Sequence, residues 1–339
     1  MDFKKIFIKD ACPTKVGGQA VLEGIMMKGA ERTSVAVRLP DDTIHIKTEK
    51  NPKASKWAKM PIIRGVVVFV SSLVQGTKSL MYSAEVLEGY EGEGAVEYED
   101  DKFSLWLEKK FGKKGAWNVM LYMSVVIAIL FTVGIFIIGP TAAVNWVKHF
   151  TTNEVALNLI EGVLRIVLFI LYIVLISKMG DIKKVFQFHG AEHKCIHCFE
   201  NGLELTPANC QTFYTLHPRC GTSFLMFVMI ISLILFSLLG WPNLIWRIVS
   251  RLLLIPVIAG LSYELLRWAG SSDNAFVKIL SMPGIYLQKL TTKEPNEAQL
   301  EVAIAAMEAV VAEKGDYGEG ICDLKGKIIK REEKEEIEE

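Results

Sequence analysis

Two long runs of uncharged, apolar residues constrain this chain more than any other feature. Trp117 to Ile138 spans 22 residues and Thr222 to Trp246 spans 25 residues, and neither contains a charged side chain. About 20 apolar residues are enough for a helix to cross the roughly 30 Å hydrocarbon core of a bilayer. The two runs therefore predict an integral membrane protein, and the mean hydropathy of +0.29 agrees with this.

Two further segments have the length of a span but carry charges. Leu157 to Ser177 contains Glu161 and Arg165, which lie four residues apart and so share one face of a helix. Leu252 to Trp268 contains Glu264 near its end. Such charges either reach the membrane interface or make polar contacts inside a helix bundle, and the sequence leaves both open.

A fifth apolar segment, Pro61 to Tyr82, has basic residues on both sides. Six Lys or Arg residues lie between positions 47 and 64, and four lysines lie between 109 and 114. Excess basic charge marks the cytoplasmic side of a span, so both flanks are predicted to lie inside. Small residues recur at Ser72, Gly76, Ser79 and Ser83, which suits close helix packing. We expect a re-entrant, interfacial or packed segment.

These segments predict an α-helical integral membrane protein with about four spans, one re-entrant or packed segment, and a small β-rich N-terminal cytoplasmic part. The expected regions are a β-rich part (1–60), the packed segment with an acidic linker (61–115), the membrane bundle (116–268) and a helical C-terminal part with a charged tail (269–339). The charge bias places both termini and the loop 178–221 in the cytoplasm. The chain is thus expected to be a multi-pass protein of the cell membrane.

The parts outside the apolar runs have patterns of their own. Thr33–Leu39 and Thr43–Glu49 alternate like strands on either side of a turn signal, and Gly17–Gly29 is a candidate third strand. Pro295–Lys314 has one apolar stripe and predicts a helix docked on the rest of the protein. Lys325–Glu339 is nearly all charge and is expected to be disordered.

The charge balance narrows the expected partners. Lys and Arg number 38, as do Asp and Glu, so the net charge is zero and nucleic acid is not indicated. The lipid bilayer and other membrane proteins are the expected partners, and the sequence does not indicate an oligomeric state.

Residues that can carry chemistry are concentrated between positions 189 and 220. This stretch holds four of the six His and four of the six Cys residues. His189 and His193 are four apart and can grip one metal ion from one helix face, with Glu192 beside them as a base. This is the His-x-x-Glu-His order of one class of zinc peptidases. His217 and Cys220 are the best candidates for a third ligand, followed by Glu200.

Other interpretations of the cluster remain open. Four thiols form a candidate structural zinc site, although they lack a second close pair: Cys195, Cys198, Cys210 and Cys220. Arg219 either binds an anionic group of a substrate or forms a salt bridge that holds the loop. Glu23 is either a solvated strand residue or a carboxylate of the site.

A set of motifs resembles the YqhQ-like family of bacterial multi-pass membrane proteins. They are GGQAVLEGIMMKG, MPIIRG, FHGAEHK, ELTPANC, HPRCGTSF, SYELLR and PGIYLQKLTTKEPNEAQLEVAIAA, and they cover about Pro13 to Ala306. The family is regarded as predicted metal-dependent enzymes of uncharacterised function. The resemblance therefore implies a membrane location and a metal, but no substrate.

The family pattern falls on particular residues of this chain. In the cluster these are His189, Glu192, His193, Lys194, Glu200, His217, Arg219 and Cys220. Outside it they are Gln19, Glu23, Gly24, Glu264 and Arg267. Cys195, His197, Cys198 and Cys210 are not part of the pattern, which argues against the four-thiol site.

Two functions from different classes follow. The first is a membrane metallohydrolase acting at the cytoplasmic face on a membrane peptide or on a lipid ester or phosphodiester. Its divalent ion, zinc by ligand type, is expected on His189, His193, His217 and Cys220, with Glu192 and Arg219 as catalytic residues. The second is a non-catalytic scaffold or adaptor whose loop is held by a structural metal or a polar network. An open metal position would distinguish the first from the second.

Overall fold

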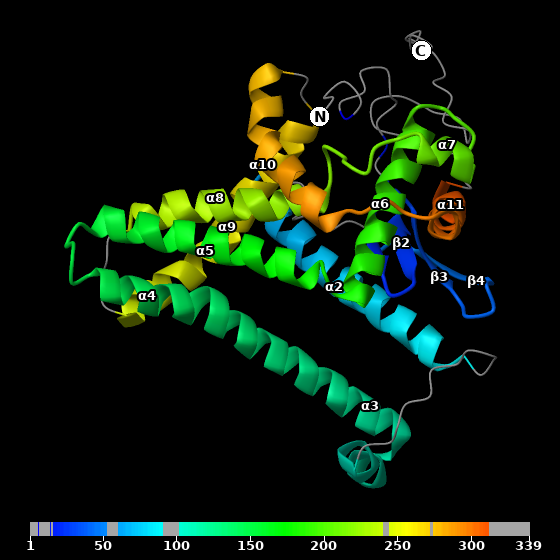
Figure 1. Cartoon of the computed structure of the whole chain (residues 1–339), viewed down its shortest axis with the longest axis horizontal. Helices are drawn as coiled ribbons and strands as arrows, with labels where there is room; N and C mark the ends of the chain where they lie inside the picture. Colours follow the sequence, from blue (N-terminus) through cyan, green and yellow to red (C-terminus); the bar gives the residue numbers. More distant parts are fainter. Residues whose placement is uncertain are drawn as a thin grey trace, which may run out of the picture. The chain divides into compact units, whose positions relative to one another are not determined.

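The computed structural model describes residues 16–52, 60–90, 102–239, 244–271 and 274–311, together with Ile6 and Thr14 (Figure 1). The strands are β1 (Gly17–Val21), β2 (Gly24–Lys28), β3 (Arg32–Arg38) and β4 (Ile44–Lys50). The helices are α2 (Ile63–Glu88), α3 (Lys102–Val133), η2 (Gly134–Ile138), α4 (Gly139–Val147), α5 (Glu154–Ile176), α6 (Gly180–Glu200), α7 (Pro207–Gln211), α8 (Gly221–Ser237), α9 (Leu244–Ser271), α10 (Ala275–Thr291) and α11 (Glu297–Val311).

The chain divides into two compact units. The first comprises Met1–Ala95, Ile173–Ile231 and Leu253–Glu339, and the second comprises Val96–Tyr172 and Ser232–Leu252. The first unit contains the sheet and the His/Cys cluster. Much of the acidic linker, residues 91–101, and the tail Lys325–Glu339 lie outside the described residues.

A four-stranded antiparallel sheet in the order β1-β2-β3-β4 forms the N-terminal part. The two strands expected on either side of the Pro40–Asp42 turn are confirmed as β3 and β4. The expected third strand, Gly17–Gly29, is instead a hairpin, because the two residues Leu22 and Glu23 turn the chain between β1 and β2. Glu23 takes a left-handed conformation in this turn, with φ of 46°.

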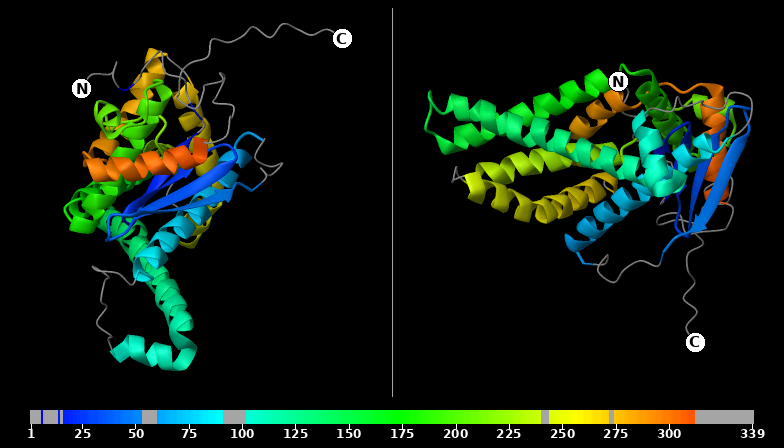
Figure 2. Two further views of the ribbon diagram at one scale, coloured as in Figure 1. Left: turned by 90° about the vertical axis from the view of Figure 1, so that its right-hand side faces the viewer. Right: turned by 90° about the horizontal axis from the view of Figure 1, so that it is seen from below.

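Helices cover both faces of the sheet. One face packs Ile25, Met27 and Ala36 against α6 and α11. The other packs Met26 and Val35 against the last turns of α2. Figure 2 shows α11 crossing the sheet on the first side. The sheet is therefore buried between helices that follow it at very different distances along the chain.

The C-terminal helix expected from Pro295–Lys314 is present as α11. Its predicted apolar stripe is buried in the core, with Leu300 and Met307 at most 1% exposed. The Ser34 hydroxyl donates a 2.6 Å hydrogen bond to the carbonyl of Ala306. Helix α11 therefore docks on the sheet, as the stripe indicates.

Helix α2 is a packed helix. Its buried positions are the small residues Gly65, Gly76, Ser79 and Ser83. A Cβ on Gly65 would lie 2.7 Å from the Cβ of Tyr263 on α9, so the two helices touch at the backbone. Arg64 pairs with Glu264 at the same contact. The charge on Glu264 therefore makes a polar contact inside the helix assembly.

Within the described residues, three helical segments are long and apolar enough to cross a membrane. They are Tyr122–Val147, Glu154–Ile176 and Val249–Ala269, and each overlaps an expected span. The expected span Thr222–Trp246 does not form one helix, because α8 ends at Ser237 and α9 begins at Leu244. Gly240 and Pro242, which disfavour helix, occur between them.

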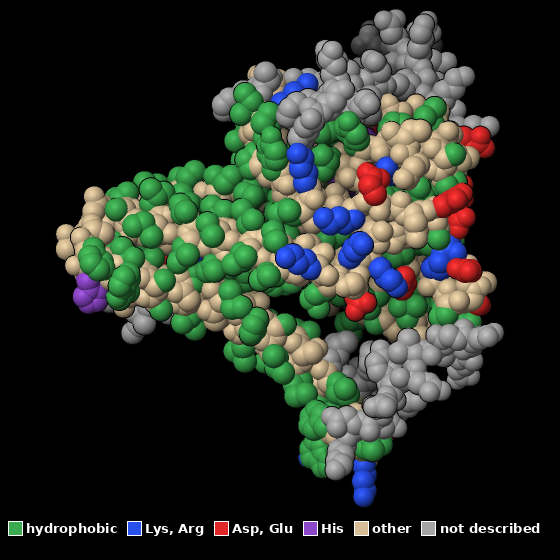
Figure 3. Space-filling view, viewed as in Figure 1, with side chains coloured by type: hydrophobic (Ala, Val, Ile, Leu, Met, Phe, Trp, Pro, Cys, Tyr) green, Lys and Arg blue, Asp and Glu red, His purple; other side chains and the backbone are tan. Residues whose placement is uncertain are grey.

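The surfaces of these helices suit a lipid environment. Large apolar side chains on α3 and α5 are strongly exposed, such as Leu130 at 65% and Val155 at 59%. Figure 3 shows hydrophobic side chains covering α4 and α5, while Lys, Arg, Asp and Glu gather over α6 and the sheet. Water-exposed surfaces rarely carry contiguous apolar patches of this size, whereas a bilayer solvates them.

Glu161 on α5 is the centre of a buried ion cluster in the second unit. Its carboxylate is 1% exposed and accepts hydrogen bonds from Arg165, Arg251 and Thr141. Arg251 also lies over the Phe236 ring, 5.1 Å from its centroid. Of the two possibilities for this charge, the structure shows the contact inside the bundle. A buried charge cluster of this kind joins α5 to α4 and α9, because each charge depends on its partners for compensation.

Gly190 in α6 is required by a close backbone contact. A Cβ there would lie 2.0 Å from the carbonyl oxygen of Lys293. We expect Gly190→Ala to lower the free energy of unfolding by about 1–3 kcal/mol through overpacking, although alanine favours helix by about 1 kcal/mol. Gly180→Ala in the same helix is the control, since nothing lies within 4 Å of its Cβ. Thermal unfolding should give a lower melting temperature for Gly190→Ala and a higher one for Gly180→Ala. Equal shifts in the two variants would contradict the contact with Lys293.

Candidate metal centre

Helix α6 carries the first two residues of the centre. It is buried from Gly190 through Glu200, where it packs against the sheet and against the neighbouring α11. The four-residue spacing places His189 and His193 on one face, with ring centroids 4.5 Å apart. The expected helix through the His-x-x-Glu-His motif is thus present.

Two backbone carbonyls orient the imidazole rings. His189 Nδ1 lies 2.9 Å from the carbonyl oxygen of Thr291, and His193 Nδ1 lies 2.5 Å from that of Thr215. A carbonyl only accepts hydrogen bonds, so both Nδ1 atoms carry the proton. Nε2 of each ring is thereby left to face another group, and metal-binding histidines show the same arrangement.

Cys220 completes the group. Its Sγ lies 3.2 Å from His189 Nε2 and accepts a 3.3 Å hydrogen bond from the backbone N–H of Thr222 at the start of α8. Ligand atoms of His189, His193 and Cys220 all lie within 4.8 Å of one another. Two ligands of a tetrahedral zinc ion, one nitrogen and one sulfur, are about 3.5 Å apart. The three residues thus form a group that could hold a metal ion.

The charges of the group are coupled. Burial alone would raise the pKa of the Cys220 thiol, but the imidazoles of His193 and His189 outweigh it and hold that pKa well below its usual range. Burial would likewise lower the pKa of His189, but the neighbouring sulfur raises it to about 9. The imidazoles thus favour the thiolate form of Cys220, which is the form that binds metal.

Glu192 lies beside the group and has a free oxygen. Its side chain is 5% exposed, and Oε2 has no hydrogen-bond partner. Burial raises its pKa, although the amide of Gly18 counteracts this. A Cβ on Gly18 would lie 2.9 Å from the Glu192 carboxyl carbon, so glycine allows β1 to approach. Buried polar atoms are nearly always satisfied, so this oxygen is available to a ligand in the neighbouring cavity.

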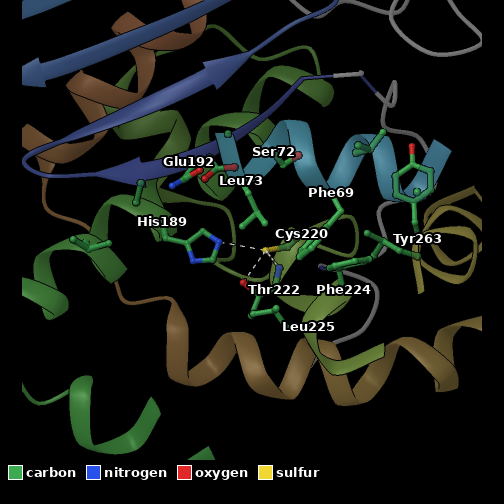
Figure 4. A pocket seen from close by; sticks show the side chains of 18 of the residues that line it. Phe69, Ser72, Leu73, His189, Glu192, Cys220, Thr222, Phe224, Leu225 and Tyr263 are labelled. Atoms are coloured by element: carbon green, nitrogen blue, oxygen red, sulfur yellow. Dashed lines mark hydrogen bonds between the residues drawn. The ribbon is translucent and has the colours of Figure 1, made fainter. Parts of the chain in front are cut away.

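A cavity of about 580 Å³ opens beside these residues. Figure 4 shows His189, Glu192 and Cys220 toward one side of it and Phe69, Phe224 and Tyr263 farther along. Its lining comes from β1, α2, α6, α8 and α9, all within the first unit. Cavities of this size commonly hold small ligands or segments of larger ones.

His217, a predicted ligand, lies in a neighbouring cluster. Its backbone N–H donates to Gln288 Oε1 at 2.8 Å, and its Nε2 lies 3.8 Å from Glu200 Oε2. Burial lowers the pKa of His217 to about 3. Its ring is 5.6 Å from that of His193, yet it does not join the group of three.

Arg219 and Glu200 form an ion pair rather than part of the cavity lining. Both carboxylate oxygens of Glu200 accept from Arg219, and Thr14 adds two 2.8 Å hydrogen bonds. Burial alone would raise the pKa of Glu200, but contacts with His217 and Arg219 lower it to about 2. Of the two roles considered for Arg219, this ion pair corresponds to the salt bridge that holds the loop.

Removing Arg219, the cation of this pair, should destabilise the folded protein. We expect Arg219→Leu to lower the free energy of unfolding by about 3 kcal/mol or more, because it leaves a buried carboxylate without its counter-ion. Denaturant unfolding of the parent and variant measures the loss. The double variant Arg219→Leu/Glu200→Gln should recover much of it, and a harmless single variant would contradict the pairing.

The thiols expected as an alternative zinc site are separated. Cys195, Cys198 and Cys210 are buried in the core cluster of α6 and α11, away from the group that holds Cys220. Contact with Cys210 and burial raise the pKa of Cys198, which keeps it protonated. Among the described residues the four thiols do not form one site.

Residues matched outside the cluster have different roles. Glu23 forms an exposed 2.6 Å salt bridge with Lys184, and Glu264 joins α9 to α2. Gln19 lines the cavity. The roles of Gly18 and of the Thr215 and Thr291 carbonyls could not be predicted from the sequence, because a backbone contact leaves no signal in the residue type.

Comparison with known proteins gives a family but no activity. Residues 60–313 match the family described as "Protein of unknown function (DUF1385)". The chain is 35% identical over 302 residues to "Uncharacterized protein YqhQ" of Bacillus subtilis (strain 168), covering 87% of this chain and 92% of that protein. No solved structure matches. The chain therefore belongs to the DUF1385 family, which includes YqhQ and has no characterised function.

Proposed function

We propose that this protein is an integral membrane hydrolase that depends on a divalent metal, zinc by ligand type. The observation that carries the proposal is the pair of histidines whose Nδ1 atoms are held by backbone carbonyls while ligand atoms of both residues and of Cys220 lie within 4.8 Å of one another. Metal-binding histidines usually donate their other ring N–H to a carbonyl or carboxylate, as both of these do.

In this proposal His189, His193 and Cys220 hold the ion. The ion supplies Lewis acidity, which makes water acidic enough to deprotonate near neutral pH. Three protein ligands leave one position open, as in catalytic rather than structural zinc sites. His217, the fourth ligand predicted from sequence, would instead orient the Glu200–Arg219 pair.

Glu192 acts as general base. Its unpartnered Oε2 lines the cavity and can accept the proton of an attacking water. The Gly18 amide would hold the carboxyl group in place. After bond cleavage the same oxygen returns the proton to the leaving group.

The site is proposed to lie at the cytoplasmic face of the cell membrane. The basic residues Lys178, Lys183 and Lys184, at the start of the His/Cys segment, support this side. The long exposed apolar helices support insertion in the bilayer. Membrane components are the proposed substrates.

Metal content and hydrolysis together test the proposal. The protein is purified in detergent without a metal-binding tag, and metals are measured by mass spectrometry. About one zinc per chain is expected, with hydrolysis that stops on chelation and returns on adding zinc. Folded protein that holds no metal would favour the scaffold alternative.

A further inference from the structure

We propose that the cavity takes an extended peptide segment with apolar side chains, which adds a strand to the outer edge of β1. This inference rests on the proposed hydrolase and names its substrate class. It selects one of the substrate classes that the sequence left open, namely peptides over lipid esters and phosphodiesters.

The lining of the cavity fits a neutral, apolar occupant. Among the described residues that line it, Glu192 is the only acidic side chain and none is Lys or Arg. Sites for phosphodiesters commonly add Arg or Lys to a metal ion, and the described lining offers the proposed ion no such second cation. Apolar side chains from α2, α8 and α9 dominate instead, including Phe69, Leu73, Phe224 and Leu266.

The edge of β1 distinguishes a peptide from a lipid ester. No strand among the described residues pairs with the side of β1 that faces away from β2. The two-residue turn is closed by the Val21–Gly24 pair. Hydrogen-bonded pairs alternate along an antiparallel ladder, so Gly18 and Ala20 direct their N–H and C=O groups outward.

These outward backbone groups lie at the cavity. Gly18, Gln19 and Ala20 all line it. The Gly18 amide is directed to Glu192, which leaves the Gly18 carbonyl and both polar groups of Ala20 available. Addition of a strand to an open edge is a common way to bind peptides, with backbone groups giving affinity and side-chain pockets giving selectivity.

The same geometry would place a peptide bond of the substrate next to the candidate metal ligands and Glu192. A peptide paired with Gly18 and Ala20 would run beside Glu192, His189 and Cys220, the residues that Figure 4 draws around one side of the cavity. Side chains on alternate residues would enter the apolar part lined by Phe69 and Phe224. The absence of a side chain at Gly18 allows the two backbones to approach closely.

Backbone methylation of the peptide tests the pairing without changing the protein. The probes are fluorescein-labelled decapeptides with Leu, Val or Phe at alternate positions, together with versions N-methylated at each position in turn. Binding to the zinc-loaded Glu192→Gln variant in lipid nanodiscs is measured by fluorescence anisotropy, with empty nanodiscs as the blank. Hydrolysis of the same peptides, of p-nitrophenyl laurate and of bis-p-nitrophenyl phosphate is measured with the parent protein.

We expect methylation to weaken binding about tenfold at two positions that lie two residues apart and less than about twofold elsewhere, because those two N–H groups would bond to the outward carbonyls of Gly18 and Ala20. Ala20→Pro, which removes one outward N–H on an edge strand, should weaken the unmethylated peptide similarly, whereas Ala20→Ser should not.

The outcomes separate this inference from the proposed function. Binding with this pattern of sensitivity but without any cleavage would support the pairing and contradict the hydrolase. Cleavage of the laurate or phosphate ester without peptide binding would support the hydrolase and overturn the peptide. Binding with uniform or no sensitivity to methylation, or no binding, overturns strand addition.

Discussion

Replacing His193 with alanine removes the bound metal. Zinc should fall from about one equivalent per chain to less than about a tenth, because two ligands remain of the three that form the group. The Nδ1 contact with Thr215 holds the His193 ring in place, so no other side chain can substitute for it without rearrangement. Mass spectrometry of the purified protein after dialysis measures the loss.

His197→Ala is the matched control. His197 lies one turn further along the same helix, is 3% exposed, and bonds through Nε2 to the carbonyl of Leu216. Its removal creates a similar cavity but leaves the group of three intact. Equal metal loss in both variants would mean that the helix, and not a ligand, had been damaged, and the assigned ligand set would fail.

Glu192→Gln abolishes turnover while keeping the metal. We expect kcat to fall by about 10²- to 10⁴-fold, the usual contribution of a general base. Glutamine has the same shape and preserves the packing against Gly18, but its amide cannot accept the proton. Steady-state kinetics on the best substrate of the hydrolysis screen, with zinc content measured on the same sample, gives the result.

Glu23→Gln is the control for this variant. Glu23 matches the family motif as Glu192 does, but its side chain is 38% exposed and pairs with Lys184. Activity should stay within about twofold of the parent, since exposed ion pairs contribute little. Full activity in Glu192→Gln would remove the general base from the mechanism.

Short-range patterns predicted the local parts of this site. The spacing of His189, Glu192 and His193 indicated a helix and a shared face, and both are present. The choice between His217 and Cys220 as the third ligand could not be made from spacing. It depends on Gln288 of α10 and on Glu200, which hold His217 from elements 71 residues and 17 residues away in sequence.

In the fold, too, local patterns predicted some elements and missed others. Alternation identified β3 and β4, and an apolar stripe identified α11. The turn at Leu22 and Glu23 escaped prediction because it lacks the Asn-Gly or Asp-Gly signal of tight hairpins, and Glu23 adopts a positive φ that few side chains favour. The length of α8 was also missed, because hydropathy alone does not show where a helix ends.

The docking of α11 on the sheet has a consequence for folding during synthesis, because the two partners are made far apart in time. Ser34 in β3 and its partner Ala306 are separated by 272 residues, and every long apolar helix is translated between them. At 5–20 residues per second, the ribosome needs roughly 15–55 s to deliver α11 after β3. During that interval the apolar sheet face of Ile25, Met27 and Ala36 lacks the part of its cover that α11 provides. The nascent protein must therefore be shielded from aggregation until its C-terminal helix emerges.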